Sequence, residues 1–144
     1  MDAFDADVLI YAAVPDHPLG VRVRALFPLD PVGTTRAFAG VGSVLLIPEL
    51  LTKVIAQQSA TELAELTALL AWLDLRPLDA VTAELAAALG AIYGLRAADA
   101  VHLATAVNAG ATRFLTNNSK DFPKSIREVD VVYPAELPHR SAAG

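Results

Sequence analysis

The chain of 144 residues carries a formal net charge of −5, contains no cysteine and is 54% hydrophobic. This length fits one domain with a sizeable core, and the hydrophobic content excludes intrinsic disorder. The lack of cysteine excludes disulfides, thiolate zinc sites and cysteine nucleophiles. The acidic balance argues against sequence-independent nucleic-acid binding, which normally needs clustered Lys and Arg. Without a bilayer-length apolar run or a signal-peptide pattern, we expect a soluble, cytoplasmic protein.

The first part of the chain predicts a strand, a helix and a loop. Residues 4–14 form an apolar segment that predicts a strand followed by a turn or short helix, and Pro15-Asp16-His17-Pro18 interrupts it. Apolar residues at helical spacing predict a helix within 21–27. Residues 28–40 are rich in Pro, Gly and Thr, which is typical of a loop.

The middle of the chain predicts a strand followed by two helices. Residues 41–47 form a β-rich apolar run, and the pattern becomes helical from Pro48 to Ile55. Ser59-Ala60-Thr61-Glu62 has the spacing of a capping box. Leucines then follow at helical intervals as far as Leu73, which predicts a second helix.

The last third predicts two helices and two strands. Asp79 is expected to cap a helix that runs to Tyr93 and ends at Gly94, a favoured position for a left-handed residue. The remaining elements are, in chain order, a helix over 97–109 closed by Gly110, a strand over 112–116, a polar loop over 117–121 and a strand over 129–133.

This alternation predicts an α/β fold in which helices flank a mostly parallel sheet. We expect one domain over residues 1–137 and a flexible tail over 138–144. Ligands of such folds bind beyond the carboxyl ends of the strands. Asp5, Glu49 and the 117–121 loop each follow a predicted strand, so we expect them to meet at one edge of the sheet.

Four carboxylates lie in apolar segments of the sequence, namely Asp5, Asp7, Glu49 and Asp99. Burying an ionised carboxylate is costly unless a cation or hydrogen-bond donors compensate, so the pattern suggests a shared metal ion. Asp99 can join the others from the start of its helix. Ordinary alternatives exist, because Asp7 can cap a helix that begins at Val8 and the other acids suit turns or helix starts.

The sequence pattern does not decide two local features, the conformation of residues 8–11 and the role of His102. The intrinsic preference of residues 8–11 favours a strand, whereas capping by Asp7 would favour a helix. His102 lies within the helix predicted over 97–109. A packing or hydrogen-bonding role for His102 is favoured over metal ligation, because the three histidines show no zinc spacing.

Four segments that carry these acids occur in a characteristic order. They are Phe4-Asp5-Ala6-Asp7-Val8-Leu9-Ile10-Tyr11, Pro48-Glu49-Leu50, Ala98-Asp99-Ala100-Val101-His102-Leu103-Ala104-Thr105-Ala106 and Phe114-Leu115-Thr116-Asn117-Asn118-Ser119-Lys120-Asp121-Phe122. Together they resemble the PIN domains of bacterial VapC-type toxins over almost the whole chain. The third segment is the most specific part of the resemblance.

The resemblance implies a PIN-like three-layer fold and an endoribonuclease that depends on Mg²⁺ or Mn²⁺. It also implies an RNA substrate, a VapB-like antitoxin partner and a homodimer. Asp5, Glu49 and Asp99, called here the three-acid set, fall on the family's catalytic metal ligands. Thr116 and Asn117 are expected to support them by orienting water or phosphate. The resemblance further implies a short helix from residue 8, with Asp7 near its cap.

The sequence departs from the family pattern at Asn118, where aspartate is common. A neutral amide can offer its carbonyl oxygen to a hard cation, but it brings no charge and should weaken a second metal site. Asp7 and Asp121 are further candidate ligands. Asp121 can equally serve only to cap the loop. Candidate phosphate contacts, each with ordinary surface charge as the alternative, are Lys53, Arg96, Arg113 and Lys120.

Two other functions remain compatible with the residues. Asn118 would suit a non-catalytic PIN-like module that binds RNA or protein. Asp5-Ala6-Asp7 is similar to the nucleophile-plus-acid pair of haloacid dehalogenase-type phosphotransferases, but Leu9 stands where that group has Thr or Val. For an antitoxin helix, exposed apolar surface near 21–27 or 50–55 is the expected docking region.

Overall fold

The computed structural model describes residues 1–28 and 37–139. Five strands form one sheet: β1 (Asp2–Phe4), β2 (Gly40–Ser43), β3 (Leu73–Arg76), β4 (Arg113–Leu115) and β5 (Asp130–Val132). Their order is β3-β2-β1-β4-β5, and the four pairings are parallel. The prediction of a mostly parallel sheet is therefore confirmed. All carboxyl ends of the strands lie at the same edge.

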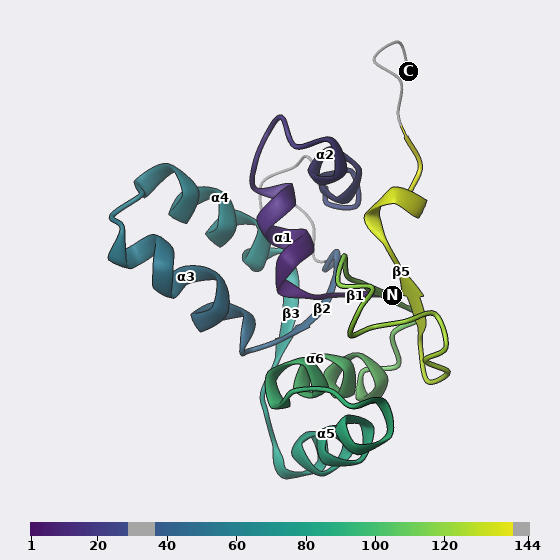
Figure 1. Cartoon of the computed structure of the whole chain (residues 1–144). Coiled ribbons are helices and arrows are strands. Elements are labelled where there is room, and N and C mark those ends of the chain that lie inside the picture. The colour runs from purple at the N-terminus through teal and green to yellow at the C-terminus, as the bar shows by residue number, and fades with distance from the viewer. Residues whose placement is uncertain (29–36, 140–144) are drawn as a thin grey trace.

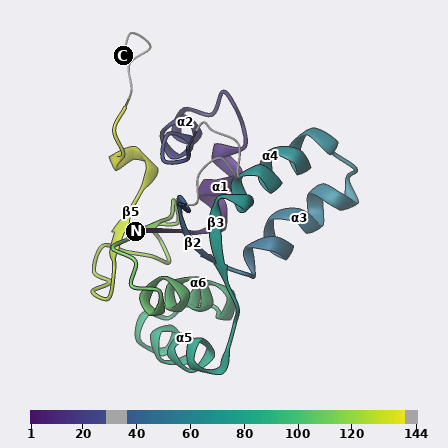
Figure 2. The same ribbon diagram turned by 180° about the vertical axis from the view of Figure 1, so that it is seen from behind.

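Helices cover both faces of this sheet (Figure 1). One layer contains α1 (Ala6–Ala12), α2 (Pro18–Arg24), α3 (Leu46–Ala56) and α4 (Ala60–Ala71). The other contains α5 (Ala80–Tyr93) and α6 (Ala97–Asn108), and a short 3-10 turn, η1 (Pro134–Glu136), follows β5. Figure 2 shows the same three layers from behind. The predicted three-layer α/β fold is confirmed.

Each face of the sheet has its own apolar core. Phe4, Leu9 and Leu46 are buried in the cluster beneath α1, α3 and α4. Leu103 and Phe114 are buried in the cluster on the α6 side.

In the described part of the chain no single helix is long and apolar enough to cross a membrane. Of the described helices, only α5 and α6 taken together, with a bend of 114° between them, reach the length and apolar composition of a membrane span.

The helix predicted from the leucine spacing after Ser59 is longer than the observed helix. Helix α4 ends at Ala71, and Leu73 begins β3 instead of continuing the helix. Strand pairing explains the change, because Leu73 pairs with Gly40 of β2 in parallel register. The predicted capping box is also wrong in its chemistry. Ser59 occupies the N-cap position, but its side chain makes no cap hydrogen bond.

The change from strand to helix near residue 45 occurs earlier than the sequence predicts. Strand β2 ends at Ser43, and α3 begins at Leu46, before Pro48. Ser43 Oγ accepts a hydrogen bond from the backbone N–H of Leu45 at 3.1 Å, which stabilises this turn. As a result, Glu49 lies in the first turn of α3, close to the carboxyl edge of the sheet.

Two predicted helix ends in the second half are confirmed. Asp79 caps α5 by accepting a hydrogen bond from the backbone N–H of Thr82 at 2.8 Å. Gly94 ends the helix with a φ of 67°, a left-handed conformation that favours glycine. Most of the loop predicted over 28–40 and residues 140–144 of the predicted tail lie outside the described residues.

Candidate active site

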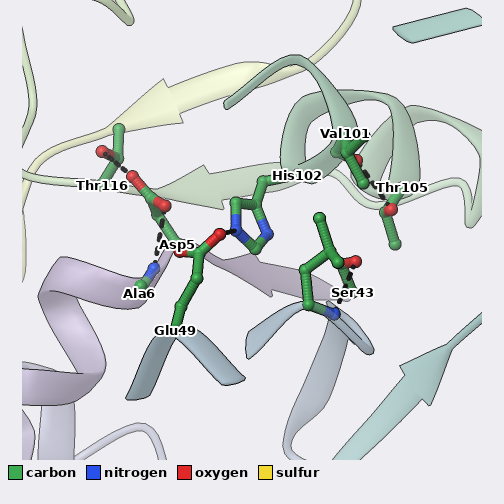
Figure 3. A network of polar contacts seen from close by, with 9 residues as sticks. Asp5, Ala6, Ser43, Glu49, Val101, His102, Thr105 and Thr116 are labelled. Atoms are coloured by element: carbon green, nitrogen blue, oxygen red, sulfur yellow. Dashed lines mark hydrogen bonds and ion pairs between the residues drawn. The ribbon is translucent and has the colours of Figure 1, made fainter. Parts of the chain in front are cut away.

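The candidate site lies where two neighbouring central strands end. Asp5 directly follows β1 and Thr116 directly follows β4, and the two strands are paired. Thr116 Oγ1 donates a hydrogen bond to Asp5 Oδ2 at 2.8 Å (Figure 3). The sheet extends from β1 to β2 and β3 on one side and to β4 and β5 on the other. Such a switch point is the usual ligand position of parallel α/β folds.

Asp5 also caps the first helix. Its Oδ1 accepts a hydrogen bond from the backbone N–H of Ala6 at 2.8 Å, and its extended backbone precedes the helix. Helix α1 therefore begins at Ala6, and the prediction that Asp7 caps a helix from Val8 is wrong. The strand preference of residues 8–11 is also overridden, because the helix buries Val8 and Leu9 in the core.

Asp7 lies in the first turn of α1 and points to the loop after β4. Its Oδ2 accepts a hydrogen bond from the backbone N–H of Asn117 at 3.0 Å. Its Oδ1 is buried and has no hydrogen-bond partner among the described residues. A carboxylate oxygen in this state lacks the compensation that burial normally requires.

Glu49 and His102 form a contact between the two helical layers. His102 Nε2 lies 2.9 Å from Glu49 Oε1, and the side chains are 1% and 34% exposed, respectively. The hydrogen-bonding role expected for His102 is confirmed. Figure 3 shows Glu49 reaching from α3 toward the ring of His102 on α6, beside Asp5.

An open pocket brings the predicted acids together. Asp99 enters it from the first turn of α6. The lining residues are Asp5, Ala6, Asp7, Ile10, Glu49, Asp99 and Asn118. The sequence therefore predicted every polar residue of this lining. Ile10 was not singled out, because one exposed apolar residue on a helix gives no functional signal.

The loop after β4 is held mainly by its own side chains. Asn118 Nδ2 donates to Asp121 Oδ2 at 2.8 Å, and Asn118 Oδ1 accepts from the backbone N–H of Asp121 at 3.3 Å. Asn117 Nδ2 donates to the hydroxyl of Tyr11 at 3.2 Å. Tyr11 was not predicted to support the site, although it lies one helical turn after Asp7 and shares its face of α1.

Burial and mutual repulsion raise the pKa values of three pocket acids. Burial raises the pKa of Asp5, against the lowering effect of the nearby His102. Burial and the charge of Asp5 raise the pKa of Asp7 to about 6. The pKa of Asp99 is raised by burial and then by the charge of Asp5. These carboxylates lack a sufficient counter-charge from the protein.

The pKa of His102 is raised by the acids around it. Burial by itself lowers this pKa, but the hydrogen bond to Glu49 and the charges of Glu49, Asp5 and Asp99 outweigh it. The imidazole supplies part of the positive charge that the pocket needs. Since the imidazole is hydrogen-bonded only to Glu49 among the described residues, it does not neutralise all the carboxylates of the pocket.

The donor chemistry of the pocket fits a hard divalent cation. Within residues 1–28 and 37–139, no three Asp, Glu or His side chains are already arranged as a metal-binding group. Two of the carboxylates are directed at other partners, since Glu49 is turned to His102 and Asp5 is hydrogen-bonded to Thr116. Carboxylate and amide oxygens nevertheless line one pocket, and the buried Oδ1 of Asp7 lacks a donor. These are the ligands that Mg²⁺ and Mn²⁺ prefer.

One candidate phosphate contact lies at the opposite edge of the sheet. Arg113 begins β4 and binds Asp2 with two hydrogen bonds of 2.8 Å. Asp2 begins β1, so the pair joins the amino ends of the two central strands. The candidate role of Arg113 as a phosphate contact at the acidic pocket is therefore wrong. Lys53, Arg96 and Lys120 are exposed.

A parallel α/β sheet with an acidic pocket at its switch point defines the class of this protein. The model of the PIN domain family matches residues 3–126. The chain therefore belongs to the PIN domain family. No curated protein matches its sequence significantly.

Three solved structures are similar to nearly the whole chain. A chain of a toxin–antitoxin complex from Klebsiella pneumoniae is 25% identical, with a TM-score of 0.70 and coverage of 95% of this chain and 100% of that one. A chain of VapBC2 from Rickettsia felis, bound to a promoter DNA fragment, is 16% identical, with a TM-score of 0.66 and coverage of 92% and 97%. A chain of FitAB bound to the IR36 DNA fragment is 21% identical, with a TM-score of 0.63 and coverage of 98% and 100%. The last two show the fold alone.

Proposed function

We propose that this PIN domain is a VapC-type toxin, a metal-dependent endoribonuclease of a toxin–antitoxin pair. The observation that carries the proposal is the pocket at the switch point, where four carboxylates meet and three of them lack sufficient counter-charge. The similarity to a chain of the Klebsiella pneumoniae toxin–antitoxin complex supports the biological setting.

The three-acid set would hold Mg²⁺ or Mn²⁺. When bound, the cation would polarise a phosphodiester oxygen and make a water molecule nucleophilic near neutral pH. The side chain of Glu49 is about one-third exposed, so it can turn from His102 toward the pocket without unfolding α3. Asp99 has no hydrogen-bond partner to give up, because none of the described hydrogen bonds engages its carboxylate.

Thr116 acts on Asp5 in this proposal. The side chain is completely buried, donates to Asp5 Oδ2, and accepts a hydrogen bond from the backbone N–H of Asn118 at 3.1 Å. It therefore fixes the orientation of one proposed ligand and is poorly placed to orient water. Asn117 supports the pocket through its backbone bond to Asp7.

RNA would approach from the open side of the pocket. Lys53 lies one helical turn after Glu49 on α3, and Lys120 lies in the loop that contains Asn118. Both side chains are exposed, so they are suitable phosphate contacts near the proposed cation. The negative net charge makes such local cations, together with the metal, the main source of attraction for RNA.

An antitoxin helix is the proposed occupant of a groove between α1, α2 and α4. Val14 and Val21 are half exposed along it, and Arg24 and Glu65 are its charged lining residues. Arg24 Nη1 is buried without a hydrogen-bond partner among the described residues. An amphipathic helix with a carboxylate at this point would bury the valines and pair the guanidinium.

A homodimer in the cytoplasm completes the proposal. Helix α5 exposes Val81 and Ile92, each about two-thirds exposed, on a surface that a second copy can cover. The mass of the purified protein in solution, measured by light scattering, tests this part. A monomer at micromolar concentration would contradict it.

Induced expression in a bacterial host tests the toxin assignment. The wild type should arrest growth, and Asp5→Asn or Asp99→Asn should abolish the arrest while leaving soluble protein. Wild-type toxicity of both variants would reject the proposed metal site. A folded wild type that binds RNA but never cleaves it would instead favour the non-catalytic alternative suggested by Asn118. The phosphotransferase alternative requires another fold, and the family assignment removes it.

A further inference from the structure

We propose that Asp7 is a direct oxygen ligand of the cation and that it, in place of Asn118 or Asp121, completes the three-acid set. The inference rests on the proposed metal-dependent function. Its basis is one oxygen atom of Asp7 that is buried in the described structure without a hydrogen-bond partner, on a residue that lines the pocket.

The side chains of Asn118 and Asp121 are already used by the loop. Asn118 donates through Nδ2 to Asp121 Oδ2 and accepts through Oδ1 from the backbone N–H of Asp121. The backbone carbonyl of Asn118 also accepts from the N–H of Phe122 at 2.9 Å. A cation at Asn118 Oδ1 would therefore compete with the backbone N–H of Asp121 for the same amide oxygen. Asp121 is also absent from the pocket lining.

Asp7 differs from Asp121 in lining the pocket and in burying its free carboxylate oxygen. Its Oδ2 is fixed by the backbone N–H of Asn117, whereas its Oδ1 is buried and lacks a partner among the described residues. The residue lines the same pocket as Asp5, Glu49 and Asp99. One carboxylate oxygen therefore orients the side chain, and the other is left for a cation.

A purely structural role does not account for a carboxylate at position 7. The N–H of Asn117 needs only an acceptor, and the amide oxygen of an asparagine would supply one without a charge. A carboxylate at position 7 instead places a second negative charge in the same pocket as Asp5, with one of its oxygens buried and unpartnered among the described residues, and like charges in a poorly solvated pocket repel each other. A shared divalent cation offsets this repulsion.

Calorimetric titration of the full chain with MnCl₂ near neutral pH tests the proposal without measuring activity. Asp7→Asn should weaken Mn²⁺ binding about tenfold or more, because a charged ligand is lost and even the loss of an outer-shell partner costs about 10–100-fold. Asp121→Asn should weaken binding clearly less than Asp7→Asn, because Asp121 lies outside the pocket lining and acts on the site only through its charge. Asp16→Asn, at an exposed turn outside the pocket, controls for the loss of one negative charge.

The outcomes separate this inference from the proposed function. If the wild type and Asp7→Asn bind Mn²⁺ equally, or if Asp121→Asn weakens binding as much as Asp7→Asn, the role of Asp7 is wrong and the metal site stands. If the wild type binds no Mn²⁺, both proposals fail. Thermal melting in EDTA should show that Asp7→Asn is at least as stable as the wild type. If that variant does not fold, Asp7→Ser, which keeps a hydrogen-bond acceptor at position 7, takes its place in the titration.

Discussion

Glu49 and His102 join the two helical layers at the carboxyl edge of the sheet, with 2.9 Å between Oε1 and Nε2. The histidine is almost completely buried, whereas the glutamate reaches the pocket surface. The pair therefore links the core of the α6 layer to a proposed metal ligand on α3. His102 Nδ1 is buried without a hydrogen-bond partner in the described structure, so the ring is held through one nitrogen.

Replacing His102 should separate the packing role of the ring from its hydrogen bond. His102→Ala leaves a cavity under α6 and should cost about 2–4 kcal/mol of unfolding free energy. His102→Leu fills most of the space and removes the unpartnered nitrogen, while Glu49 can turn to solvent, so it should cost less than about 1.5 kcal/mol. Urea denaturation measures both. Equal losses would show that the bond to Glu49, and not packing, dominates.

The metal-free protein should lose stability as pH rises from about 4 through about 6. Folded Asp7 keeps its proton up to about pH 6, whereas in the unfolded chain the same group has its ordinary pKa of 3.8. The folded state thus binds more protons in this window, and the shift corresponds to at most about 3 kcal/mol. The raised pKa values of Asp5, Asp99 and His102 act in the same direction.

Urea denaturation in EDTA at several pH values measures this slope. Asp7→Asn should flatten it, because the variant has no proton to release at that position. Stability that increases with pH over the same window would contradict the electrostatic account of the pocket.

The pair of Asp2 and Arg113 should contribute to the fold and not to the site. It lies at the amino ends of β1 and β4, opposite the acidic pocket, and is only partly shielded from water. Arg113→Met should therefore cost only about 1 kcal/mol of unfolding free energy and leave Mn²⁺ affinity unchanged. The double variant with Asp2→Asn measures the coupling. A large loss of metal affinity in Arg113→Met would restore this arginine as a site residue.

Gly20 allows α1 and α2 to approach closely. A Cβ atom at this position would lie 2.0 Å from the backbone carbonyl oxygen of Tyr11. The backbone cannot move as easily as a flexible side chain, so Gly20→Ala should cost at least about 2 kcal/mol. Gly90→Ala provides a control, because a Cβ at Gly90 meets its nearest atoms at 3.5 Å. Similar melting temperatures of the two variants would disprove the close contact.

The sequence predicted the sheet, most of the helices and the acidic lining of the site because these depend on strong local patterns. It missed β3, since Leu73 continues the leucine spacing of α4 and only pairing with β2 makes it a strand. It placed the start of α1 two residues late, because intrinsic preference could not show that Asp5 caps the helix. The bond between Glu49 and His102 spans distant segments and has no local signal.

Cleavage of RNA by the purified chain tests the central claim most directly. A mixed RNA substrate is incubated with the wild type in Mn²⁺, with the wild type in excess EDTA, and with Asp99→Asn in Mn²⁺. The proposed function predicts internal cleavage only in the first reaction, with the loss in Asp99→Asn reaching about a hundredfold or more. Equal cleavage in EDTA, or by folded Asp99→Asn, would contradict it.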